Sequence, residues 1–110
     1  MNEQVQAYIS TFPPEINQLF RQLRQLILDS APCAPEETLW ARLPSFYVGE
    51  RFVRLIPFRD HINVEASAIL PHREELPGCK ITPKGMLQLY PGKDVPREAL
   101  IRIFTKTLCG

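Results

Sequence analysis

The chain has 110 residues, of which 45% are hydrophobic and 23% are charged. This length and composition are typical of one globular domain that buries a core without disulfide or metal staples. Thirteen basic against twelve acidic side chains give a net charge of +1, and a chain without a strong positive field is not expected to bind nucleic acid or an anionic membrane. We therefore expect a single domain over residues 1–110, with no nucleic-acid partner and no membrane association.

Two features of the sequence favour the cytoplasm. The chain does not open with basic residues followed by an apolar run, which is the pattern of a secretory signal. Cys33, Cys79 and Cys109 are odd in number and far apart, so their spacing matches neither a disulfide framework nor a zinc site. We expect three free thiols and a cytoplasmic protein.

The N-terminal part of the chain shows helical periodicity. Asn2 is a suitable N-cap for a short first helix, which ends before Pro13 and Pro14. Residues 15–30 carry apolar side chains at i, i+3, i+4 and i+7 with polar ones opposite, and this pattern predicts a longer amphipathic helix. Pro32 ends that helix, because the residue before a proline is disfavoured in helical conformation.

A third, shorter helix is predicted over residues 35–41. Pro35 and the two glutamates after it suit the first turn of a helix, where the backbone dipole favours negative charge. Trp40 is then expected to anchor this helix by burying its indole ring.

Beyond Pro44 the apolar residues alternate with polar ones, which is the period of strands. The predicted strands of this antiparallel meander are residues 45–48, 51–58 and 61–65. A two-residue turn between the last two strands fixes their register, since a slip of one residue would mix buried and exposed side chains. The resulting pairs are Phe58 with His61, Ile56 with Asn63 and Arg54 with Glu65.

This register divides the meander into two faces. The predicted core face carries Val53, Leu55, Pro57, Ile62 and Val64. The opposite face carries the candidate ligand- or partner-binding residues Tyr47, Phe52, Arg54, Phe58, His61, Asn63 and Glu65, with Ile56 among them and Gln88 or Tyr90 beside them. Exposed aromatic surface rimmed by charge is typical of a binding site. Residues 66–80 form a short helix or an irregular loop, and the sequence leaves open whether they cover this face.

The C-terminal part is predicted to add two short strands and a last helix. The strands are residues 80–82 and 86–90, and Asp94 or Val95 is the expected N-cap of the helix. The buried stripe predicted for this helix consists of Leu100, Ile101, Phe104 and Leu108. Helices at both ends with antiparallel strands between them predict an α+β fold, a two-layer α/β sandwich with the terminal helices on one face of the sheet.

Several short motifs occur in an order found in one family of small proteins. They are Tyr8 and Ile9, Leu-Arg-Gln-Leu-Ile at 23–27, Pro-Glu-Glu-Thr-Leu-Trp at 35–40, Leu-Pro-Ser-Phe at 43–46, His61 and Ile62, Lys-Gly-Met-Leu-Gln-Leu at 84–89, and Val-Pro-Arg-Glu-Ala-Leu-Ile at 95–101. Over nearly its whole length the chain resembles the YdhG-like family of cytosolic proteins, which lies near the frataxin and YjbR folds. The resemblance implies a frataxin-like fold and, for some members, a role as an intracellular iron chaperone.

Iron handling would need oxygen ligands, because ferrous iron accepts carboxylates. The candidate metal ligands are Glu36, Glu37, Glu74 and Glu75 rather than the cysteines. We expect any iron binding to be weak and no cofactor to be required.

No sequence pattern in the chain pairs a nucleophile with a base or cradles a phosphate. We therefore expect a binding protein and not an enzyme, either a monomer or a weak homodimer, whose partner is iron or another protein. Two functions stay open: an iron-chaperone-like role, implied by the resemblance, and a metal-independent ligand- or protein-binding module that uses the open sheet face.

Overall fold

The computed structural model describes residues 1–109, which form one six-stranded sheet and three α-helices. The helices are α1 (Glu3–Ile9), α2 (Pro14–Ser30) and α3 (Arg97–Cys109), and a 3-10 helix, η1, spans Leu70–Glu75. The strands are β1 (Glu36–Trp40), β2 (Leu43–Val48), β3 (Arg51–Pro57), β4 (Ile62–Ala66), β5 (Lys80–Ile81) and β6 (Leu87–Leu89). All neighbours are antiparallel, in the order β1-β2-β3-β4-β6-β5.

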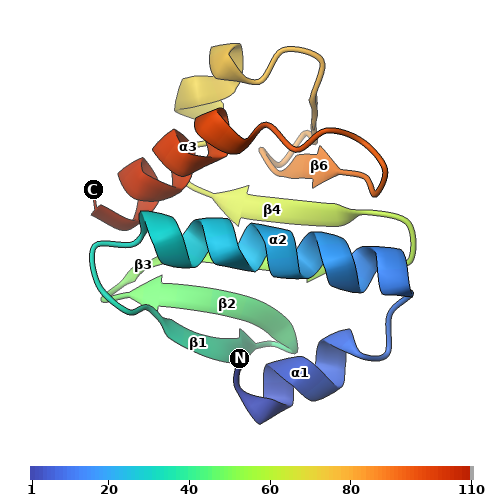
Figure 1. Cartoon of the computed structure of the whole chain (residues 1–110). Coiled ribbons are helices and arrows are strands. Elements are labelled where there is room, and N and C mark those ends of the chain that lie inside the picture. Colours follow the sequence, from blue (N-terminus) through green and yellow to red (C-terminus); the bar gives the residue numbers. More distant parts are fainter. Residues whose placement is uncertain (110) are drawn as a thin grey trace.

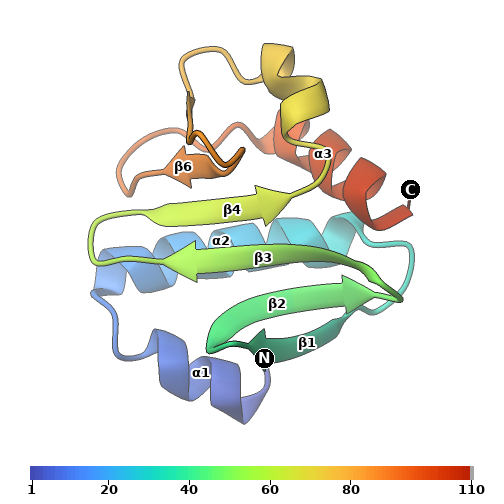
Figure 2. The ribbon, with the colours of Figure 1, turned by 180° about the vertical axis from the view of Figure 1, so that it is seen from behind.

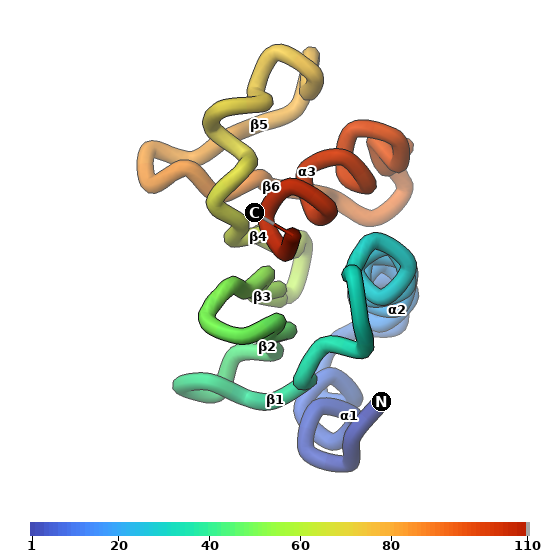
Figure 3. Tube along the Cα trace, turned by 90° about the vertical axis from the view of Figure 1, so that its left-hand side faces the viewer, coloured from blue at the N-terminus to red at the C-terminus, as the bar shows by residue number. Residues whose placement is uncertain are grey.

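The sheet and the helices form two layers, as the sequence predicts. Figures 1 and 2 show α2 and α3 on one side of the sheet and bare strands on the other. The same layers are seen edge-on in Figure 3. Within residues 1–109, no helix is both long enough and apolar enough to cross a membrane.

The two N-terminal helices agree with the sequence prediction. Asn2 caps α1, since its side-chain oxygen accepts the backbone N–H of Val5 at 2.8 Å. Proline occupies the first position of α2, where a missing N–H leaves no donor unpaired. The predicted apolar stripe of α2 is buried against the sheet and consists of Ile16, Leu19, Phe20, Leu23, Leu26 and Ile27.

The prediction of a helix over residues 35–41 is wrong, because this segment forms β1. Pairing with β2 gives all five residues a sheet partner, whereas a helix of so few residues has little intrinsic stability. The turn that makes this hairpin has two residues in the left-handed region, Ala41 with φ 50° and Arg42 with φ 67°. Trp40 consequently projects from the open face with 53% of its surface exposed, and its predicted role as a buried anchor is also wrong.

The register of the central meander is as predicted. Arg54 pairs with Glu65 and Ile56 with Asn63, and the N–H of Phe58 donates to the carbonyl of His61 at 2.8 Å. The predicted core face is buried beneath the helices: Val53, Leu55, Pro57, Ile62 and Val64.

Residues 66–80 pack toward α3 and reach the open face only at the end of the sheet that carries Phe52 and Glu65. The N–H of Ala68 donates to the Thr107 hydroxyl at 3.2 Å, and Glu75 of η1 forms an ion pair with Arg102. The segment therefore leaves Phe58 uncovered, with 42% of its surface exposed.

The last helix begins at Arg97, later than the predicted caps, and buries a slightly different stripe. Its buried residues are Ala99, Leu100, Ile103, Phe104, Thr107 and Leu108. Ile101 is 36% exposed, so its predicted burial is wrong. It lies about 100° around the helix from Leu100, which turns it out of the stripe that faces the sheet.

Candidate functional site

The structure brings the predicted binding residues together on the open face. Tyr47 comes from β2, Phe52 and Arg54 from β3, and Asn63 and Glu65 from β4. Phe58 and His61 flank the turn between β3 and β4, at one end of the same face. Strand pairing accounts for this arrangement, because paired residues of neighbouring strands project from the same face.

Arg54 is the centre of this face and is itself buried, with only 5% of its surface exposed. Its Nε donates to the Ser45 hydroxyl at 2.8 Å, its Nη1 to Glu65 at 3.0 Å and its Nη2 to the Tyr47 hydroxyl at 3.0 Å. The predicted pairing of Arg54 with Glu65 is correct, but within this pair only the glutamate reaches solvent.

Two aromatic rings account for this burial. The guanidinium carbon of Arg54 lies 4.2 Å from the ring centroid of Trp40 and 4.2 Å from that of Phe52. Such contacts attract a cation to the negative face of the ring and displace water from it. Arg54 thus fixes Trp40 on the sheet and divides the open face into two parts.

One part is a surface that we call the aromatic patch. It consists of Trp40, Leu43, Ile56, Phe58, His61 and Tyr90. Phe58 stacks on His61 with ring centroids 4.4 Å apart, and Tyr90 lies 5.4 Å from His61 on a tilted plane. The His61 ring is held in turn by Asp60, whose carboxylate lies 2.7 Å from Nδ1, and this contact lowers the pKa of the Asp60 carboxyl.

Asn63 lies beside this patch, between Ile56 of β3 and Gln88 of β6. Its side-chain oxygen is buried and has no hydrogen-bond donor among residues 1–109. An unpaired acceptor at this depth weakens the sheet locally.

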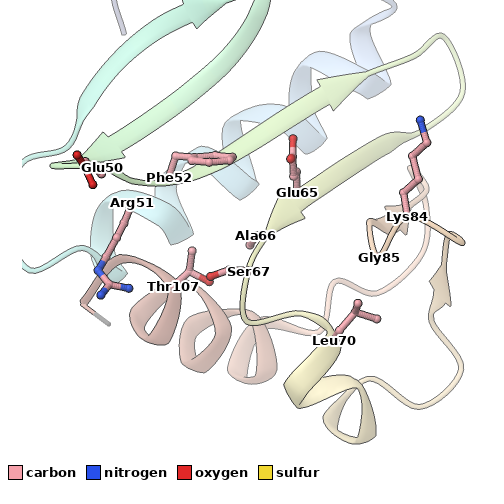
Figure 4. A pocket seen from close by; sticks show the side chains of 10 residues that line it. All are labelled: Glu50, Arg51, Phe52, Glu65, Ala66, Ser67, Leu70, Lys84, Gly85 and Thr107. Atoms are coloured by element: carbon pink, nitrogen blue, oxygen red, sulfur yellow. The ribbon is translucent and has the colours of Figure 1, made fainter.

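The other part of the open face is a pocket of about 410 Å³ at the opposite end of the sheet. Phe52 and Glu65 line it, together with Ser67, Leu70 and residues from the start of β3 and the C-terminal end of α3. Figure 4 shows these side chains around the pocket.

The four candidate metal ligands are not brought together. Glu37 is engaged by Arg24 of α2 through two hydrogen bonds of 2.9 Å, and this contact raises the pKa of the arginine. Glu75 contacts Arg102 and, at 2.7 Å, His72, and these two groups lower the pKa of its carboxyl. Glu36 and Glu74 are exposed.

The two glutamate pairs also lie far apart in the fold: Glu36 and Glu37 are on the edge strand β1, whereas Glu74 and Glu75 are in η1, near the opposite edge strand β5 (Figure 3, where η1 is yellow). Within residues 1–109 no three His, Cys, Asp or Glu side chains are close enough together to hold a metal ion. The four predicted ligands therefore do not form one cluster of carboxylates.

The sequence prediction did not place Trp40 on the open face, and it did not foresee the pocket. Trp40 could have been found from the segment 36–40, where a β-branched Thr38 and the aromatic ring itself favour a strand. The pocket had no local signal, because its lining comes from segments as distant as Glu50 and Thr107.

No protein-family model, no curated protein and no solved structure matches this chain. The resemblance to the YdhG-like family, with the iron handling that it implies, stays a prediction. The structure itself shows an α+β sandwich whose sheet keeps one face open.

Proposed function

We propose that the chain is a metal-independent, non-catalytic binding protein that docks a protein partner on the aromatic patch. The observation that carries this proposal is the exposure of two large aromatic side chains, Trp40 at 53% and Phe58 at 42%, on one rigid sheet face. Water-exposed aromatic rings of this size are costly unless a partner covers them.

Both rings are held in place before any partner arrives. Arg54 supports Trp40 from below, and His61 stacks against Phe58. Ordered side chains lose less conformational entropy on binding, so these two rings are suited to act as anchors. Tryptophan, tyrosine and arginine are the residues most enriched among the anchors of protein interfaces.

The charges at the rim of the patch define the chemistry of the partner. Arg42 lies in the turn of the β1–β2 hairpin, Arg59 follows Phe58, and both are exposed. Neither forms an ion pair within residues 1–109, whereas Asp60, a carboxylate at the same rim, contacts His61. The partner that complements this surface carries apolar side chains flanked by carboxylates.

A displayed library of random peptides, selected on the intact chain, tests the proposal. We expect enrichment of peptides that combine Trp, Phe or Leu with Asp or Glu. Trp40→Ala and Phe58→Ala should each weaken the selected peptides by about tenfold, the effect of losing one aromatic anchor. Arg42→Glu combined with Arg59→Glu should reverse the preference for acidic peptides.

Ile101→Ala is the matched control, because Ile101 is an exposed apolar residue on the helical side of the molecule. Thermal unfolding of each variant shows whether it keeps the fold. Selected peptides that bind the Trp40 and Phe58 variants as tightly as the unmodified chain would exclude the aromatic patch as the docking surface.

A further inference from the structure

The pocket at the other end of the open face is built differently from the aromatic patch. Its apolar walls come from Phe52, Ala66 and Leu70, and its volume of about 410 Å³ is that of a small-molecule site. Arg54 lies over one face of the Phe52 ring and does not line the pocket. The Phe52 ring also contacts Tyr47, with ring centroids 5.7 Å apart, and the rest of its surface lines the pocket.

Leu70 holds its place in the wall because Gly85 has no side chain. Gly85 has φ +87°, and a Cβ added there would lie 2.9 Å from Leu70 Cδ1. Glycine suits this position for two reasons: its backbone is left-handed, and any side chain would collide with Leu70 in the pocket wall. Figure 4 shows Leu70 and Gly85 together on the side away from Arg51.

A buried hydroxyl group marks where a polar group of the ligand belongs. Thr107 is only 2% exposed, yet it lines the pocket. Its oxygen accepts the N–H of Ala68 at 3.2 Å, and its own proton has no acceptor among residues 1–109. Ser67 adds a second hydroxyl on the same side, next to Thr107 in Figure 4. Ser67 is exposed and its hydroxyl is open to solvent, so the buried Thr107 hydroxyl is the stronger reason to expect a ligand with acceptor atoms.

The charged residues around the pocket indicate which charge the acceptor group of the ligand carries. Arg51 and Lys84 line opposite ends, and neither forms an ion pair within residues 1–109. Glu65 and Glu50 also line the pocket, but Glu65 is neutralised by Arg54. Two free cations therefore face one free carboxylate, and the balance favours an anion.

We propose that this pocket binds a small aromatic carboxylate. The ring of the ligand packs between Phe52 and Leu70, where offset stacking on Phe52 is available. Its carboxylate accepts the hydroxyl protons of Thr107 and Ser67, and Arg51 supplies the opposite charge. The site is separate from the aromatic patch and does not depend on the docking of a protein there.

Titration of the full chain with naphthoate, followed by amide NMR shifts, tests the proposal. We expect saturable binding with a dissociation constant below about 1 mM, with the largest shifts at Ala66, Ser67, Leu70 and Thr107. Naphthamide and naphthylmethylammonium have the same ring without the negative charge and should bind at least about tenfold more weakly, since they lose the charge-assisted hydrogen bonds.

Three variants locate the carboxylate. Thr107→Val removes the buried hydroxyl and should weaken naphthoate binding by about tenfold, and Ser67→Ala and Arg51→Gln should weaken it by smaller factors. The last two residues are at the surface, so these variants keep the test valid if Thr107→Val unfolds the chain. Thr105→Val is the matched control, because the hydroxyl of Thr105 lies on the same helix and donates to Ser30, outside the pocket.

Three results would overturn the inference. They are equal binding of naphthoate and the cationic probe, the largest shifts at Trp40 and Phe58, and no saturation by about 10 mM naphthoate. The peptide selections on the aromatic patch have a separate readout, so either proposal can fail while the other stands.

Discussion

The face of the sheet beneath α2 and α3 is closed by apolar packing, whereas the open face buries its central residue, Arg54, through directed contacts. Val53, Leu55 and Val64 on the covered face are fully buried in one apolar cluster with the side chains of the helices. Arg54 needs three hydrogen-bond acceptors and two aromatic rings in fixed positions. Apolar packing tolerates exchange of one hydrophobic residue for another, but a directed network loses several contacts when one member changes.

The largest difference between the faces is expected for two phenylalanines. Phe46 on the covered face has no exposed surface, whereas Phe58 on the open face is well exposed. Phe46→Ala should lower the free energy of unfolding by about 3–5 kcal/mol because it leaves a cavity. Phe58→Ala should lower it by about 1 kcal/mol or less. Urea denaturation measures both, and equal losses would mean that the open face is covered in solution.

The next effect concerns the arginine that organises the open face. Arg54→Ala should cost about 2–3 kcal/mol, less than a fully buried ion pair because Glu65 reaches solvent. Arg54→Met keeps much of the side-chain packing and should cost less. Arg24→Ala, which breaks the ion pair at the β1 edge, serves as the comparison and should also cost less, because Arg24 is the more exposed arginine. A negligible loss for Arg54→Ala would contradict the burial of this group.

A smaller effect, this time an increase in the free energy of unfolding, is expected at the β1–β2 hairpin. Ala41 has φ 50°, a conformation that is strained for any residue with a Cβ. Ala41→Gly should raise the free energy of unfolding by about 1 kcal/mol. Gly92→Ala, at φ 80°, is the reverse control and should destabilise the fold. If the midpoint temperatures of thermal unfolding shift in the same direction for both variants, this account of the hairpin is refuted.

The smallest expected effect is on how thermal stability depends on pH in the acid range. Arg102 and His72 hold the pKa of Glu75 below its ordinary value of 4.5. The stabilisation from this carboxylate is present above that ordinary value and is lost as the pH falls through the lowered pKa of the folded state. Glu75→Gln should therefore flatten the loss of thermal stability in acid, whereas Glu74→Gln should leave that loss unchanged. Parallel melting curves for the Glu75 variant and the unmodified chain would disprove the coupling.

The parts of the fold that the sequence predicts well are those with a local and unambiguous period. In residues 15–30 the apolar stripe repeats over several turns, and in the meander any slip would mix the two faces. The segment 35–41 misleads because a proline followed by two glutamates is typical of a helix start. Here the glutamates are the first residues of an edge strand, and pairing with β2 decides the outcome.

The candidate site was predictable only in part, for the same reason. The register alone places Phe52, Arg54 and Glu65 on one face. The burial of Arg54 depends on Trp40, which belongs to the segment assigned to the wrong element. The Thr107 hydroxyl reaches the pocket from the last helix, and its relation to Phe52 arises only in the folded chain.

The side chain of Asn2 joins the first helix to the rim of the sheet. Its side-chain oxygen caps α1, and its side-chain amide donates to the carbonyl of Glu37 at 2.7 Å. Glu37 lies on β1, an edge strand of the sheet. A strand with free backbone groups can recruit a strand from another molecule and start a fibril-like stack. Because Asn2 occupies one of those groups and α1 packs against β1, we expect the first turn of the chain to hinder strand pairing at β1 by another molecule.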